Sequence, residues 1–155
     1  MSVEALPYTL LLLLAQFTAG LAAMVLFVQL RGGFEAGFIR VCTWLTISGA
    51  ALTTLTALAL EPRAIVDSYR LDESFLDLAA AAALALLLFS VVHAFFVRRE
   101  DEPFLAKATG ATTVALGLVL LFMLSALVRP PTWSAAGTML TLIAGSAAAP
   151  GRTAG

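Results

Sequence analysis

The sequence predicts an all-α fold, a polytopic transmembrane bundle of five helices in a single membrane domain over residues 1–155. Apolar residues make up 61% of the chain and charged residues only 12%, whereas soluble domains carry about 25% charge. Every Lys, Arg, Asp and Glu lies between or outside five uncharged stretches, and each stretch has the roughly 20 apolar residues that a helix needs to cross a bilayer. The expected spans, of which the fifth is the weakest, are residues 5–30, 41–60, 78–97, 108–128 and 133–149.

The first stretch is interpreted as a retained span and not as a cleaved signal peptide. Its uncharged run extends over residues 5–30, well beyond a signal h-region of about 7–15 residues. The residues before it include Glu4 and no base, whereas a signal peptide begins with basic residues.

The remaining spans have ends that the sequence marks with turn and interface residues. Gly32 and Gly33 indicate a tight turn after the first span. Pro62 and Pro130 end the second and fourth spans, because proline lacks the amide hydrogen that continues a helix. Trp133 opens the fifth span, where an amphipathic ring favours the headgroup region.

The orientation follows from the Lys and Arg residues of each connector, because acids contribute little to the positive-inside rule. With five spans, one side of the membrane collects six basic residues and the other side three. The richer side is expected to be cytoplasmic, which places the N-terminus outside and the C-terminus inside a bacterial inner (plasma) membrane. If the fifth segment does not span, the count of basic residues becomes five on one side of the membrane and four on the other. The six residues are Arg31, Arg40, Arg98, Arg99, Lys107 and Arg152, and the three are Arg63, Arg70 and Arg129.

Small residues recur at intervals of four in four of the expected spans, which favours close helix packing. In lipid, small residues on one face let helices approach each other, and this packing replaces the missing hydrophobic drive. A compact bundle is therefore expected. The stripes are Ala15, Ala19 and Ala23; Thr46, Ala50 and Thr54; Thr109, Thr113 and Gly117; and Gly137, Thr141 and Gly145.

Few side chains in the spans could carry chemistry. Inside the expected spans His93 is the one side chain of the acidic and basic residue types, and the lone Cys42 is read as a small packing residue. The absence of buried acids and bases disfavours an ion or proton pathway. A net charge of −1 gives no indication of a nucleic-acid partner. We find no catalytic set and no metal-ligand spacing, so an independent enzyme is not expected.

A quinone site is the sharpest hypothesis that these residues allow. His93 lies near the expected cytoplasmic end of the third span, and Gln29, Trp44 and Arg40 lie at a similar depth on the first two spans. A quinone headgroup needs hydrogen-bonding groups for its oxygens and a side chain suited to proton exchange, and histidine titrates nearest to neutrality. The alternative is an interfacial histidine that bonds a neighbouring Ser or carbonyl group.

A haem held by this chain alone is not expected, because axial ligation usually takes two residues and the chain has one histidine. Met24, Met123 or Met139 would have to supply the second ligand. The sequence leaves one cofactor open, which is a quinone bound at a site shared with a partner subunit.

Three elements resemble the N-terminal part of membrane anchor subunits of the dimethyl-sulfoxide-reductase and polysulfide-reductase type. They are Pro7–Gln16 with Gly20, the run Leu58–Arg63, and Arg129–Trp133 followed by Thr138–Gly145. In that family the last element is a proline-tryptophan loop that leads into the fifth helix, and the N-terminus faces out. The family also has a leucine-histidine-leucine-glycine-arginine-proline run at the quinol site. Of that run only Pro62 is matched here, which points to a reduced, structural relative.

These observations predict a small non-catalytic membrane subunit that anchors or completes a respiratory or electron-transfer complex and contributes to a quinone pocket. Its expected partners are the lipid bilayer and the other membrane or peripheral subunits. Two alternatives stay open. One is an oligomeric small-molecule transporter or channel component. The other is an assembly or regulatory factor that binds other membrane helices through the small-residue stripes.

Overall fold

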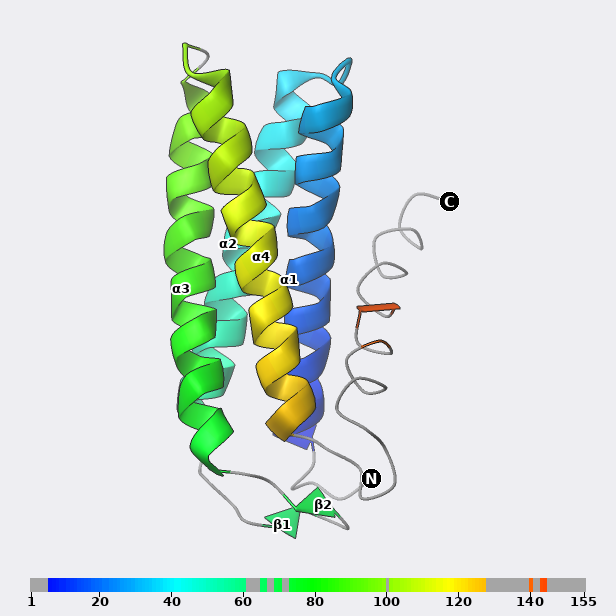
Figure 1. Cartoon of the computed structure of the whole chain (residues 1–155), viewed down its shortest axis with the longest axis vertical. Coiled ribbons are helices and arrows are strands. Elements are labelled where there is room, and N and C mark those ends of the chain that lie inside the picture. The colour runs from blue at the N-terminus through cyan, green and yellow to red at the C-terminus, as the bar shows by residue number, and fades with distance from the viewer. Residues whose placement is uncertain are drawn as a thin grey trace.

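The computed structural model describes residues 6–60, 65–66, 69–70, 73–99, 101–127, 140 and 143–144, and this part of the chain is all-α (Figure 1). Its helices are α1 (Leu6–Arg31), α2 (Ala36–Ala59), α3 (Glu73–Arg98) and α4 (Pro103–Leu127). The connection between α2 and α3 holds a two-residue antiparallel ladder. There β1 (Ile65–Val66) pairs with β2 (Tyr69–Arg70), with Ile65 opposite Arg70.

All four helices are long and apolar enough to cross a membrane, which confirms the first four predicted spans. The chain is accordingly a multi-pass membrane protein in its described part. The predicted fifth span lies outside the described residues, except for Leu140, Ile143 and Ala144. Of these, Ile143 packs, partly buried, against the core.

Three of the four helices begin earlier than the uncharged stretches that predicted them. Relative to those stretches, α2, α3 and α4 each start five residues earlier, at Ala36, Glu73 and Pro103. A hydropathy pattern marks only the part of a helix that lies in hydrocarbon, whereas backbone hydrogen bonding continues through charged residues into the headgroup region. Lys107, which was expected in a connector, therefore lies within the first turns of α4.

Local sequence explains the two short connectors at one end of the bundle. After α1, Gly32 and Gly33 adopt φ values of 69° and 80°, which only glycine adopts without steric cost. The amide of Gly32 donates to the carbonyl of Val28 at 3.0 Å, which closes the helix end. Proline is favoured at the first helical position because its missing amide hydrogen is not needed there, and Pro103 occupies that position in α4.

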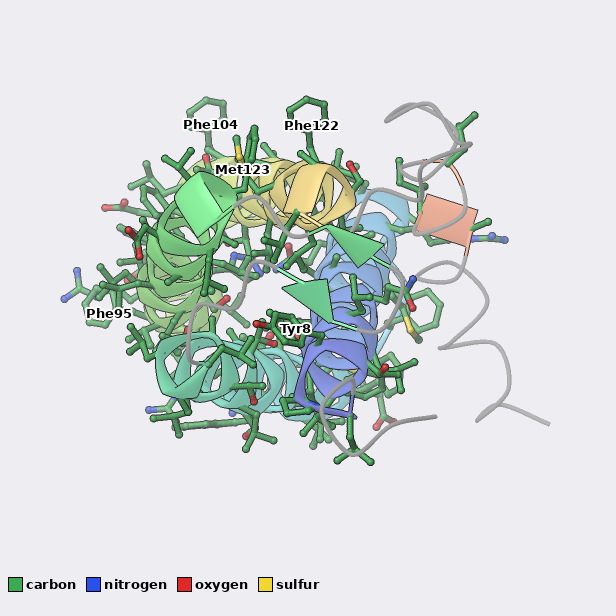
Figure 2. All side chains as sticks on the ribbon, turned by 90° about the horizontal axis from the view of Figure 1, so that it is seen from below. Tyr8, Phe95, Phe104, Phe122 and Met123 are labelled. Carbon is green, nitrogen blue, oxygen red and sulfur yellow. The ribbon has the colours of Figure 1, made fainter. Side chains whose placement is uncertain are left out.

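The four helices form a ring in which each helix packs against two neighbours. The packed pairs are α1 with α2, α2 with α3, α3 with α4, and α4 with α1. Figure 2 shows this ring from one end, with Phe95, Phe104 and Phe122 projecting away from it. These outward phenylalanines suit contact with lipid chains, and the small residues are left for the interior.

Small residues set the separation of the helices within the ring. A methyl group added to Gly49 on α2 would lie 2.5 Å from Thr18 Oγ1 on α1. A methyl group on Gly117 of α4 would lie 3.2 Å from the Cβ of Ala19 on α1. The predicted close packing is therefore present. In the described helices, the residues of the small-residue stripes are buried between helices of the same chain, with two exceptions. Ala23 is exposed and Thr109 is half-buried.

Buried hydroxyl groups in the bundle are satisfied locally. Thr18, Thr53 and Ser90, for example, each donate to the carbonyl four residues earlier, at 2.7 Å. In a medium without water every polar group needs an internal partner, and this local bond removes the cost of burying a hydroxyl. Most buried hydroxyl groups of the interior thus have a hydrogen-bond partner, so a buried polar atom without one is informative.

Candidate functional site

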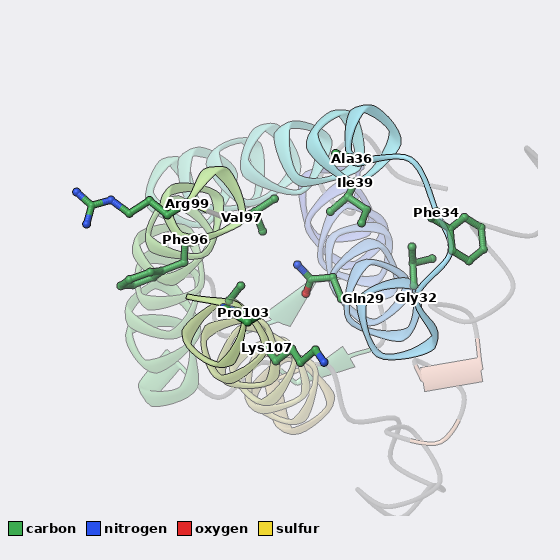
Figure 3. A pocket seen from close by; sticks show the side chains of 12 residues that line it. Gln29, Gly32, Phe34, Ala36, Ile39, Phe96, Val97, Arg99, Pro103 and Lys107 are labelled. Atoms are coloured by element: carbon green, nitrogen blue, oxygen red, sulfur yellow. The ribbon is translucent and has the colours of Figure 1, made fainter. Parts of the chain in front are cut away.

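A cavity of about 290 Å³ lies at the end of the bundle that holds the two short connectors (Figure 3). This is the end opposite β1 and β2 in Figure 1. All four helices contribute to its wall, because α1 and α3 end there and α2 and α4 begin there. The lining residues are Val28, Gln29, Gly32, Phe34, Ala36, Ile39, Phe96, Val97, Arg99, Pro103, Ala106 and Lys107.

The cavity exists because small residues face it while the nearby large ones turn elsewhere. Gly32, Ala36 and Ala106 supply little side-chain volume to the wall. Phe34 stacks against Phe38, with ring centroids 6.1 Å apart, and both side chains are exposed. The space left between the helix ends is lined largely by apolar atoms, as is usual for small-molecule pockets.

Two basic residues lie at the mouth of the cavity. Figure 3 shows Arg99 pointing away from the opening and Lys107 extending from α4 toward α1. The Arg99 guanidinium lies over the ring of Phe95, 4.5 Å from its centroid, in a cation–π contact. Lys107 is consequently the cationic side chain that is better placed to meet a ligand at the mouth.

One helical turn deeper than the cavity wall, a histidine joins α3 to α4. His93 is only 4% exposed, and its Nδ1 lies 3.1 Å from Thr109 Oγ1. The wall residues Val97 and Ala106 are one turn nearer the end of the bundle on the same two helices. His93 and Thr109 thus form a polar layer directly below the cavity.

Gln29 connects this polar layer to the cavity. Its side chain lines the cavity, and its Oε1 lies beside the imidazole of His93 at Gly110. A methyl group added to Gly110 would lie 2.9 Å from His93 Cε1 and 3.3 Å from Gln29 Oε1. Glycine at this position gives the two side chains room to meet.

Gln29 Oε1 and His93 Nε2 are buried polar atoms that lack a hydrogen-bond partner. Within the described residues they are the buried side-chain oxygen and nitrogen atoms that make no hydrogen bond with the protein. A buried polar atom without a partner costs about 1–3 kcal/mol, and such groups are rare in native proteins. Two of them, on residues that both lie against Gly110 at the cavity end of the bundle, indicate a place where a ligand completes the hydrogen bonding.

Of the four residues predicted for a quinone site, the structure brings together His93 and Gln29. Trp44 is 53% exposed and lies on the outside of the bundle, where the Arg98 guanidinium is 5.4 Å from the centroid of its ring. Arg40 is exposed as well. Neither Trp44 nor Arg40 lines the cavity.

Thr109 and Gly110 belong to this site, and the sequence interpretation saw Thr109 only as part of a packing stripe. A signal was present, because His93 and Thr109 are each eight residues from Asp101, in the middle of the α3–α4 connector. Residues equally far from a short antiparallel turn lie at the same depth. Which faces of the two helices meet, however, depends on their packing and not on this spacing.

The methionines considered as second haem ligands are not gathered at His93. Met123 lies 14 residues beyond Thr109 on α4, which is about 21 Å along the helix at about 1.5 Å per residue. Met24 is half-buried on α1, and Met139 lies outside the described residues. In the described part of the chain, no three His, Cys, Asp or Glu side chains are grouped so that they could hold a metal ion.

Comparison with known proteins adds no family to this description. No protein-family model matches the chain, and no curated protein or solved structure shows significant similarity to it.

Proposed function

We propose that this chain is a non-catalytic membrane subunit of an electron-transfer complex and binds a quinone-type headgroup in the cavity at the end of its bundle. The observation that carries the proposal is the pair of unpartnered buried atoms, Gln29 Oε1 and His93 Nε2, beneath an apolar cavity. The resemblance of three sequence elements to reductase anchor subunits also supports it.

The cavity has the properties that a quinone-type ligand needs. Its volume of about 290 Å³ is just below the range for small-molecule sites, about 300–1,000 Å³. This volume suits a headgroup of one or two rings whose tail stays in lipid. Apolar side chains such as Val28, Ile39 and Val97 would contact the ring. Gln29 and His93 would meet a ring oxygen at the deep end.

In this proposal the chain supplies binding, and the redox centre belongs to a partner subunit. Electrons would pass between the ligand and that centre. The role of this bundle would be to hold the headgroup at the membrane surface, where such a partner docks.

We place the cavity end of the bundle in the cytoplasm of a bacterial cell, with the N-terminus outside. The short connectors and the adjacent helix ends carry Arg31, Arg40, Arg98, Arg99 and Lys107, and cytoplasmic loops are rich in Lys and Arg. The fifth span predicted over residues 133–149 would return the chain to that side. A peripheral partner subunit would then approach from the cytoplasm.

The direct test is ligand binding by the chain in lipid nanodiscs, with duroquinone as the probe. We expect saturable binding that His93→Ala weakens by about tenfold, because the variant leaves one ring oxygen without its partner. Val91→Ala serves as the control, because Val91 lies on the same helix and is 50% exposed. Equal binding by wild type and His93→Ala would contradict the site.

A second test addresses the complex. The chain is purified from its native membranes in a mild detergent, and the accompanying chains are identified. Copurification of a subunit with an iron–sulfur or molybdenum centre is the expected result. A stable oligomer of this chain alone, with a polar central pore, would support a transporter instead.

A further inference from the structure

Arg40 and Trp44, which do not line the cavity, belong to a separate patch on the outside of the bundle. Both lie on α2 and are four residues apart, so their side chains share one face of that helix. The guanidinium of Arg98, at the end of α3, lies over the ring of Trp44, 5.4 Å from its centroid. All three residues are exposed. Two arginines from packed neighbouring helices are therefore close to one tryptophan ring.

This patch of Arg40, Trp44 and Arg98 lies at the boundary between the apolar part of the bundle and its charged end. Arg40 immediately precedes the uncharged stretch of α2, and Arg98 immediately follows the uncharged stretch of α3. Tryptophan favours this level of a membrane, where its amphipathic ring meets the lipid headgroups. The patch is therefore at the level of the phosphate groups of the lipids.

Both guanidinium groups of the patch have hydrogen-bond donors to spare. A guanidinium carries five N–H donors in one plane, and contact between its face and a ring leaves the N–H groups at its edge free. In the described part of the chain, neither Arg40 nor Arg98 forms an ion pair or a hydrogen bond through its side chain. The described acids at this end of the bundle, Glu35, Asp101 and Glu102, thus leave both groups free for another anion.

Exposed apolar side chains continue the patch toward the middle of the membrane. Leu52 lies eight residues after Trp44 on α2, and Val91 lies seven residues before Arg98 on α3. At these spacings each shares the helix face of the patch residue on its own helix. Leu52 is 52% exposed and Val91 is 50% exposed. A phospholipid matches both parts of this surface, whereas an acidic peptide of a peripheral partner would match only the arginines.

We infer that Arg40, Trp44 and Arg98 bind the phosphate group of an anionic phospholipid such as phosphatidylglycerol. Arginine suits a phosphate because its N–H groups match the phosphate oxygens in geometry as well as in charge. A zwitterionic lipid binds less well, because it brings a cation of its own to the two arginines. The inference is independent of the proposed quinone site, since none of the three residues lines the cavity.

The fluorescence of Trp44 reports on lipid contact directly. The chain has two tryptophans, so Trp133→Phe leaves Trp44 as the only one. This variant is placed in phosphatidylcholine nanodiscs that contain increasing fractions of brominated phosphatidylglycerol or brominated phosphatidylcholine, because bromine quenches tryptophan at contact. We expect half-maximal quenching at a fraction of phosphatidylglycerol lower by about fivefold per arginine, the usual contribution of a basic residue near an anionic membrane surface.

Arg40→Gln and Arg98→Gln, made in this background, should each reduce the preference for phosphatidylglycerol by about fivefold. Arg31→Gln is the matched control, because Arg31 is exposed at the same end of the bundle but lies on α1, and its loss removes the same charge. Equal losses in all three variants would show that the charged end attracts anionic lipid as a whole, and would overturn the site.

Other results would also overturn the inference. Equal quenching by the two brominated lipids means that the patch has no preference for an anionic headgroup. Relief of the quenching by glycerol 3-phosphate in solution means that the patch binds a free phosphate group. Loss of the quenching in a complex with copurifying subunits means that a protein partner covers the patch.

Native mass spectrometry of the unaltered chain decides the question if Trp133→Phe does not fold. The chain in detergent is mixed with equal amounts of phosphatidylglycerol and phosphatidylcholine. Wild type should retain mainly phosphatidylglycerol, Arg98→Gln should retain less of it, and Arg31→Gln should behave as wild type. Equal retention of the two lipids by wild type would contradict the site.

Discussion

At the scale of single residues, the site depends on a glycine as much as on the polar side chains. The imidazole of His93 and the amide of Gln29 both occupy space that a side chain at residue 110 would need. Interiors are close-packed, so an added methyl group must displace something. Here the displaced groups would be the imidazole ring of His93 and the amide of Gln29, which lie closest to the added atom.

Gly110→Ala should therefore weaken duroquinone binding by several-fold while the chain remains folded. The added Cβ would lie 2.9 Å from His93 Cε1, so the imidazole must turn away from its bond to Thr109. Binding is measured in nanodiscs and folding by thermal unfolding in the same lipid. Gly37→Ala is the control, because a Cβ at Gly37 meets nothing within 4 Å. Full binding by Gly110→Ala would show that the pair does not contact the ligand.

Sequence reasoning identified His93 and Gln29 because they are unusual residues in apolar spans. It also selected Trp44 and Arg40, which share their depth along the helices but face outward. Depth follows from counting residues along a helix. The direction in which a side chain points within the bundle follows from how the helices are rotated against each other, and weakly amphipathic spans reveal little of that.

At the scale of elements, the approach of α1 to α2 depends on the pair Gly49 and Thr18. A methyl group at Gly49 would lie 2.5 Å from Thr18 Oγ1. This hydroxyl is held in place by its bond to the carbonyl of Leu14 at 2.7 Å and lies 3.5 Å from Thr53 Oγ1. The helices cannot keep their present separation if Gly49 acquires a side chain.

Gly49→Ala should lower the free energy of unfolding by about 1–3 kcal/mol, the usual cost of overpacking a close contact. The measurement is unfolding in mixed detergent micelles. The double variant with Thr18→Ala should recover part of the loss, because it removes the hydroxyl that the new methyl group meets. If the two substitutions are simply additive, the helices do not touch at these residues.

The α1–α2 connector gives a second prediction for an element. Gly32 has a φ of 69° and no atom near its missing Cβ, so Gly32→Ala introduces backbone strain without a steric clash. The expected loss of stability is about 1–2 kcal/mol, the cost of left-handed backbone for a residue with a Cβ. Gly37→Ala in the first turn of α2 lacks this strain and should leave stability unchanged or raise it. A neutral Gly32→Ala would argue against the turn.

At the scale of the whole molecule, the four-helix ring requires a lipid environment. Large apolar side chains cover its outside, among them Leu13, Leu55 and Phe104, which are 58%, 63% and 78% exposed. A soluble protein does not expose apolar surface of this extent. Alkaline carbonate washing should therefore leave the chain in the membrane pellet. Its release into the supernatant would contradict a membrane-spanning bundle.

The orientation proposed for the bundle is also tested on the intact chain. Cys42 is the one cysteine and is buried, so a Cys42→Ser background allows single cysteines to be placed at will. Ser68→Cys, between α2 and α3, should react with a membrane-impermeant maleimide in intact cells. Glu35→Cys, between α1 and α2, should react only after the membrane is opened. The reverse pattern would place the cavity outside the cell.

The sequence by itself determined the membrane class and the first four helices, because a bilayer imposes one length and one composition on any segment that crosses it. It also determined that the interior has few reactive groups, since this follows from which residues are present. Only the tertiary structure decided that His93 and Gln29 share a site with Thr109 and Gly110, and that Trp44 and Arg40 do not. Helix rotation and separation determine those contacts, and both depend on packing between residues far apart in the chain.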